Sequence, residues 1–155
     1  SNSSEIRKIV REISAEDPIS EWKKVEMLYD WVRENIEYTR GELKTVRQAL
    51  RDRAGDCEEM TSTFVALCRA NGIAARPIGG YVCPQSGVLK ARDYHNWGEF
   101  YENGIWKLAD PQKRVLMQNT ADYIAMRIIH GSEDDPMGPY NRFRFRGEGL
   151  EVRMN

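Results

Sequence analysis

Apolar side chains recur at helical spacing through the first half of the chain. This pattern predicts helices over residues 5–13, 18–38, 45–53 and 57–70. Ser20 can cap the second of these helices and Thr45 the third, because both side chains can accept a backbone N–H at a helix start. Asn71-Gly72 then supplies a stop signal, since glycine readily takes the left-handed conformation that ends helices.

Shorter apolar runs in the second half predict strands. Residues 73–82 form one such run, which Pro77 and Gly79-Gly80 are expected to break, and residues 83–92 form a loop. Two further strands, 93–101 and 105–110, flank Asn103-Gly104, which is the strongest short hairpin signal.

The last part of the chain predicts one more helix and one more strand. Thr120 caps a helix expected over residues 121–129, and residues 131–141 form a polar loop. Phe143 and Phe145 alternate with arginines, which is typical of an edge strand, and Leu150 with Val152 can extend it.

The hairpin brings a histidine and an aspartate onto one face of the sheet. If Asn103-Gly104 is a two-residue loop, Trp97 faces Asp110, and His95 is a diagonal neighbour of Asp110 at roughly 7 Å. A four-residue loop keeps this parity, whereas a three-residue loop breaks it. A carboxylate beside an imidazole fixes its tautomer and stabilises the imidazolium, which is what a general base requires.

Cys57 is the candidate nucleophile because it opens the helix predicted over residues 57–70. The free N–H groups and the dipole at a helix start favour a thiolate and can also stabilise an oxyanion. Position alone also fits an inert buried cysteine. Cys68 lies about 20° away on the same helix wheel and is expected in the core, and Cys83 is expected to be structural. A disulfide between Cys68 and Cys83 is possible, but no feature of the sequence supports it.

Composition limits the classes of function. The 155 residues suit one globular domain, expected over residues 4–155, with Ser1-Asn2-Ser3 resembling the remnant of an expression tag. A net charge of −1 gives no reason to expect a nucleic-acid partner, and no apolar run is long enough to cross a membrane. The cysteines and histidines match no zinc template, so neither a metal nor a cofactor is expected. His130 is expected at a helix end, outside any site.

Several motifs, taken in order, resemble the core of the transglutaminase-like superfamily over about residues 25–112. They are Gly55-Asp56-Cys57, Ala70-Asn71-Gly72-Ile73, Tyr94-His95-Asn96-Trp97, Gly104-Ile105-Trp106 and Asp110-Pro111. The resemblance implies an α+β, papain-like fold in which the cysteine helix packs on an antiparallel sheet. It also implies a triad of Cys57, His95 and Asp110, and so supplies the contact between Cys57 and His95 that spacing cannot give.

The resemblance leaves two points unassigned, namely the effect of Asn96 and the identity of the second oxyanion donor. Asn96 stands where many members of the family carry a small residue. A second oxyanion donor is expected upstream, and Trp22, Trp31 and Tyr38 are equal candidates.

The resemblance implies attack by a thiolate on a peptide-like amide to give a thioester. Water is the expected acceptor in a small bacterial-type domain, which gives a cysteine peptidase or amidase acting on a peptide or protein. The alternatives are a protein-glutamine acyltransferase and a catalytically inactive binding module of the same fold. Frequent export within the family favours a periplasmic or secreted location.

Overall fold

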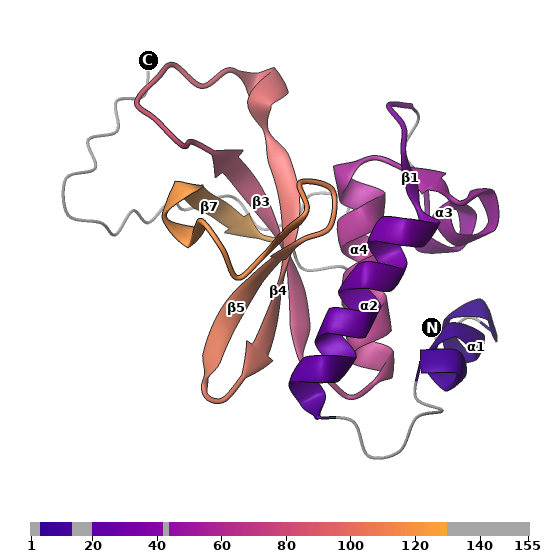
Figure 1. Cartoon of the computed structure of the whole chain (residues 1–155). Helices are drawn as coiled ribbons and strands as arrows, with labels where there is room; N and C mark the ends of the chain where they lie inside the picture. Colours follow the sequence, from indigo (N-terminus) through magenta and orange to yellow (C-terminus); the bar gives the residue numbers. More distant parts are fainter. Residues whose placement is uncertain (1–3, 14–19, 42–43, 130–155) are drawn as a thin grey trace.

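The fold pairs a group of helices with one antiparallel sheet (Figure 1). The computed structural model describes residues 4–13, 20–41 and 44–129. The sheet has the order β6-β5-β4-β3-β7. Its strands are β3 (Ala75–Val82), β4 (His95–Glu102), β5 (Ile105–Asp110), β6 (Val115–Leu116) and β7 (Tyr123–Ile128). Every neighbouring pair is antiparallel, so the α+β fold class is confirmed.

Four helices form the other part. They are α1 (Ser4–Ile13), α2 (Glu21–Asn35), α3 (Val46–Asp52) and α4 (Cys57–Ala70). Ser20 caps α2 and Thr45 caps α3, as predicted. The helix expected over residues 18–38 is too long, because the chain becomes extended at Ile36. Residues 37–38 instead form β1 (Glu37–Tyr38), which pairs in parallel with β2 (Ala54–Gly55).

The α4 helix joins the helices to the sheet. It packs against β4 and β3 on one side and against α2, α3 and α1 on the other (Figure 1). Phe64 is fully buried at the contact, where a Cβ on Gly98 of β4 would lie 2.8 Å from its ring. Cys68 is fully buried on the same helix, which confirms its predicted place in the core.

The β4–β5 hairpin has the predicted register. Tyr101 pairs with Trp106 and Glu102 with Ile105, so Asn103 and Gly104 form the two-residue loop. Both loop residues have positive φ, 51° and 83°, as a type I′ turn requires. The parity on which the His95–Asp110 prediction depends is therefore the observed one.

The predicted break in residues 73–82 is wrong, because β3 runs unbroken from Ala75 to Val82. Its two glycines serve close approaches instead. The register against β7 shifts between Gly79 and Gly80, and a Cβ on Gly80 would lie 2.1 Å from the carbonyl oxygen of Ile124.

The helix predicted over residues 121–129 is also wrong. A single turn, η2 (Thr120–Asp122), leads into β7, which pairs with β3 from Val82↔Tyr123 to Ile78↔Ile128. Tyr123 packs edge-on against Trp97, with ring centroids 5.0 Å apart. Sheet pairing with a distant segment has outweighed the local helical spacing.

Other predictions have mixed outcomes. All three cysteines are free, so Cys68 and Cys83 form no disulfide. The loop at 131–141, the edge strand near 143–145 and the placement of His130 lie outside the described residues. The single domain over residues 4–155 stays a prediction.

Replacing Gly80 with alanine tests the β3–β7 contact. The added methyl meets backbone and the Trp97 ring, neither of which can rotate away, so Gly80→Ala should lower the free energy of unfolding by about 1–3 kcal/mol. Urea unfolding measures the change. Gly41→Ala is the matched control, because nothing lies within 4 Å of the added atom. Equal effects of the two substitutions would contradict the close approach.

Candidate active site

Cys57 is the first residue of α4, as predicted, and its side chain is partly exposed. Asp56 caps the helix and accepts a hydrogen bond from the N–H of Glu58 at 2.8 Å. Asp56 also accepts the N–H of Glu59, so the N–H of Cys57 itself is the first-turn donor that can stabilise negative charge beside the thiol.

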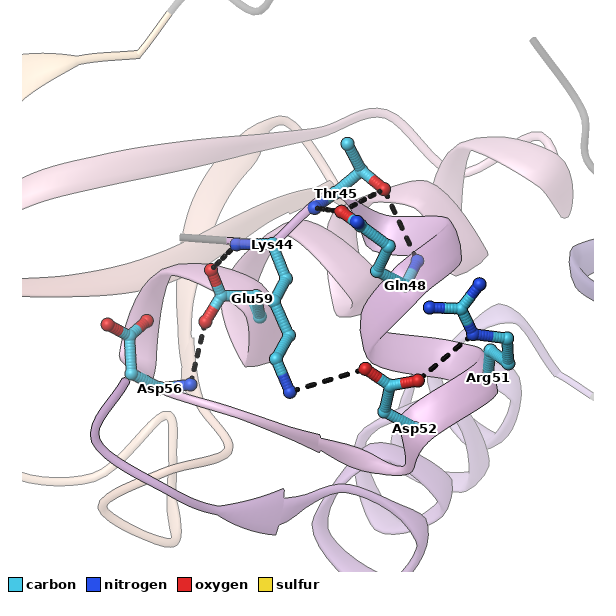
Figure 2. Close-up of polar contacts among 7 residues, drawn as sticks. All are labelled: Lys44, Thr45, Gln48, Arg51, Asp52, Asp56 and Glu59. Carbon is cyan, nitrogen blue, oxygen red and sulfur yellow. Dashed lines mark hydrogen bonds and ion pairs between the residues drawn. The ribbon is translucent and has the colours of Figure 1, made fainter. Parts of the chain in front are cut away.

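Glu59 holds the chain that leads into Cys57 (Figure 2). Its side chain is buried, and one carboxylate oxygen accepts the N–H of Asp56 at 2.7 Å. The other oxygen accepts the N–H of Lys44 at 2.9 Å. A Cβ on Gly55 would lie 2.5 Å from the Cβ of Glu59, so the backbone passes directly over this carboxylate. Glu59 therefore fixes the start of α4 against the segment that precedes α3.

The structure brings His95 and Asp110 together. His95 Nε2 lies 2.6 Å from Asp110 Oδ2, and both side chains are buried. Asp110 also accepts the hydroxyl of Tyr123 at 2.8 Å and the N–H of Lys113 at 3.1 Å. The imidazole stacks beside Trp97, with centroids 6.3 Å apart. Since Nε2 is bound to the carboxylate, Nδ1 is the nitrogen left for another partner.

The Cys57 thiol interacts with the same imidazole. Burial lowers the pKa of His95. Hydrogen bonds to Asp110 and Cys57, together with the charges of those two groups, raise it by more than burial lowers it, so the pKa is about 9. The thiol is thus close enough to interact directly with the ring. The three residues singled out in the sequence lie together at the start of α4, the start of β4 and the end of β5.

Tyr123 is the site residue that the sequence did not reveal. Burial and the nearby Asp110 raise its pKa, so its hydroxyl stays protonated and donates to the carboxylate. The helix wrongly predicted over residues 121–129 hid this role, because the tyrosine reaches Asp110 only from a strand paired with β3.

The three upstream oxyanion candidates separate in the structure. Trp22 packs against Phe100 at 6.2 Å, and Trp31 lies beneath the guanidinium of Arg53 at 4.9 Å. Tyr38 belongs to β1 and pairs with Gly55, two residues before Cys57. Among these candidates, Tyr38 is the one held beside the start of α4.

The described ranges contain no metal-binding cluster and no membrane-spanning helix. There, no group of three or more histidine, cysteine or acidic side chains is placed to hold a metal ion. None of the helices in the same part of the chain combines the length and apolar character needed to cross a membrane. Cys83, in a loop, donates its thiol to the carbonyl of Gln85 at 2.9 Å.

Comparison with known proteins identifies the family. The model of the transglutaminase-like superfamily core matches residues 7–111, which is more than half of the chain. The chain belongs to the transglutaminase-like superfamily. A search of curated proteins found no match.

Solved structures agree with this membership in the superfamily. A candidate cysteine protease from Cytophaga hutchinsonii is 26% identical, with a TM-score of 0.61 over 77% of this chain. The periplasmic domain of TgpA from Pseudomonas aeruginosa is also 26% identical, with a TM-score of 0.55 over 72% of this chain. The chain spans less than half of either structure, 41% and 43% respectively.

Removing the Glu59 carboxylate should be costly. Glu59→Ala leaves two backbone N–H groups without their acceptor, and we expect the free energy of unfolding to fall by about 2–4 kcal/mol. Gln48→Ala is a matched control, since Gln48 has the same position in the capping box of α3 but is exposed (Figure 2). It should cost about 1 kcal/mol or less. Chemical unfolding of both variants measures the difference. Equal losses would contradict the role of the Glu59 carboxylate in holding the backbone of Lys44 and Asp56.

The pKa of His95 predicts a stability that depends on pH. Its pKa is about 9 in the folded protein against 6.5 for an ordinary histidine. The protonated ring therefore adds stability below pH 6.5, and this is lost as the pH rises through 9, by up to roughly 3 kcal/mol. Urea unfolding at pH 6 and pH 9.5 measures the loss. His95→Gln should flatten the profile, and an unchanged profile in that variant would rule out His95 as its source.

Proposed function

We propose that this chain is a cysteine-dependent hydrolase, a peptidase or amidase, that attacks peptide-like amides through Cys57. The observation that carries the proposal is the pair of interactions that His95 makes, since its Nε2 lies 2.6 Å from Asp110 Oδ2 and the Cys57 thiol interacts with the same ring. A core cysteine has no need of such a partner, whereas a nucleophile does.

The reaction proceeds in two halves. His95 has taken the thiol proton before the substrate arrives, because its raised pKa keeps the ring protonated at neutral pH, and the Cys57 thiolate sulfur forms a bond to the amide carbonyl carbon. The N–H of Cys57 at the start of α4 stabilises the oxyanion, and Tyr38, whose backbone pairs with Gly55, is the proposed second donor. His95 then protonates the leaving nitrogen, the C–N bond breaks, and a thioester remains.

Water completes the cycle. It gives a proton to His95 as its oxygen bonds to the thioester carbon, and the carboxylic acid leaves as the C–S bond breaks, which restores the Cys57 thiolate beside the protonated His95. Asp110 holds the ring orientation and stabilises its charge throughout, and Tyr123 keeps the carboxylate in place.

The relatives support this choice of reaction and suggest a location. The Cytophaga hutchinsonii structure is described as a candidate cysteine protease, which favours hydrolysis of a peptide or protein. The TgpA relative is a periplasmic domain, which favours a location outside the bacterial cytoplasm.

Alkylation with iodoacetamide tests the nucleophile. Cys57 should be modified rapidly at a pH below 7, and His95→Ala should slow this reaction at least tenfold because the imidazolium that stabilises the thiolate is lost. Peptide mapping by mass spectrometry distinguishes Cys57 from Cys68 and Cys83, which serve as internal controls in the same sample.

If Cys57 reacts no faster than Cys83, the enzymatic proposal is contradicted and a binding module is favoured. Incorporation of an added primary amine into a glutamine peptide would instead replace the hydrolase with an acyltransferase.

A further inference from the structure

A hollow with a volume of about 380 Å³ lies where α2 ends and β1 begins. This volume is within the ~300–1,000 Å³ that is usual for small-ligand sites. The end of α2, β1 and the turn after β5 all contribute to its lining. The charged side chains of the lining are Arg33, Glu34, Glu37, Arg53 and Arg114.

The three arginines come to this hollow from separate parts of the chain. Arg53 follows α3, and its Nη1 donates to Oδ1 of Asn35, another lining residue, at 3.5 Å. Burial raises the pKa of Tyr29 to about 12, while the charges of Arg33 and Arg114 act to lower it, so both guanidinium groups lie near this one hydroxyl. Like charges gathered in one place repel one another, and an anion among them would relieve that repulsion.

Carboxylates of the chain pair with only one of these arginines. Arg33 Nη2 lies 3.3 Å from Asp30 Oδ1 and 3.8 Å from Glu34 Oε1. Among the residues that the structure describes, no carboxylate forms an ion pair with Arg53 or Arg114. Both therefore keep N–H donors for a ligand, and the planar fork of a guanidinium matches the two oxygens of a carboxylate.

The charge of the lining favours a ligand with a single negative charge. Two glutamates, Glu34 and Glu37, stand against the three arginines, which leaves one net positive charge. A carboxylate would balance that charge, whereas a phosphate dianion would meet additional repulsion from both glutamates. Ile36 and Met60 are buried and also line the hollow, so they offer an apolar surface to the carbon chain that carries the carboxylate.

The turn after β5 connects this hollow to the candidate active site. Pro111 and Gln112 line the hollow and directly follow Asp110. The N–H of Lys113 donates to Asp110 Oδ1 at 3.1 Å, and the N–H of Arg114 donates to the carbonyl oxygen of Pro111 at 3.4 Å. A ligand bound to Arg114 would therefore be held by the same turn that supports the Asp110 carboxylate.

We propose that this hollow binds a carboxylate group of a peptide, with Arg53 and Arg114 as the main donors and Arg33 as a further positive charge. Two sources supply this group, the side chain of a glutamate or aspartate and the free C-terminus of a chain. Cys57 and His95 do not line the hollow, so the inference goes beyond the proposed function and does not depend on it.

Titration followed by NMR tests the site. Three tripeptides are added to the isotope-labelled chain. One has a central glutamate and blocked ends, one has a central glutamine and a free C-terminus, and one has a central glutamine and blocked ends. A peptide with a carboxylate should shift the backbone amide signals of residues 36–38 and 112–114 until they saturate, and the neutral peptide should not. The tighter-binding of the two charged peptides identifies the source of the carboxylate.

Variants that change charge extend the test in both directions. Arg53→Gln and Arg114→Gln should each weaken binding of the charged peptide by roughly 3- to 10-fold, the value of a charge-assisted hydrogen bond at a partly exposed site. Glu37→Gln removes a repelling charge and should strengthen binding by about twofold. Arg92→Gln is the matched control, because Arg92 is an exposed arginine in η1 (Ala91–Asp93), outside the hollow.

Several results would overturn the inference. They are equal binding of the neutral peptide, tighter binding of inorganic phosphate, and the absence of saturable shifts at residues 36–38 and 112–114. An affinity that Arg53→Gln and Arg114→Gln reduce no more than Arg92→Gln does would also overturn it. No part of this experiment requires a reaction at Cys57, so its failure is distinguishable from failure of the hydrolase proposal.

Discussion

The close approach of α4 to β4 is the constraint on which the site depends. Cys57 begins the helix and His95 begins the strand, so their contact requires the two elements to pack closely. Gly98 permits this, because Phe64 occupies the space where any larger residue would place its Cβ. A hydrophobic contact on the helix thus sets the position of a polar contact at the helix end.

Two buried carboxylates then fix the details. Glu59 binds backbone N–H groups and sets the position of the helix start, whereas Asp110 binds a side chain and sets the orientation of the imidazole. Each carboxylate is satisfied by at least two donors, which offsets the cost of burying its charge. The proposed reaction would therefore begin from groups that are already held in place, which lowers its reorganisation cost.

What the sequence predicted well was local. The bounds of α4, its stop at Asn71-Gly72 and the hairpin register follow from neighbouring residues, and the register was enough to place His95 beside Asp110. Tyr123 could not be predicted because its strand is defined by pairing with β3, far away in the chain. The role of Glu59 was hidden for another reason, since its partners are backbone N–H groups that leave no trace in a side-chain pattern.

The Asn103-Gly104 turn also bears on how the site assembles. His95 and Asp110 are only 15 positions apart. The turn closes the loop between them with positive φ angles, which asparagine and glycine both adopt readily. Closing so short a loop costs little chain entropy, whereas joining Cys57 to His95 requires a longer segment to be ordered. His95 and Asp110 thus form a low-contact-order unit that can fold early, and Cys57 joins them when α4 docks.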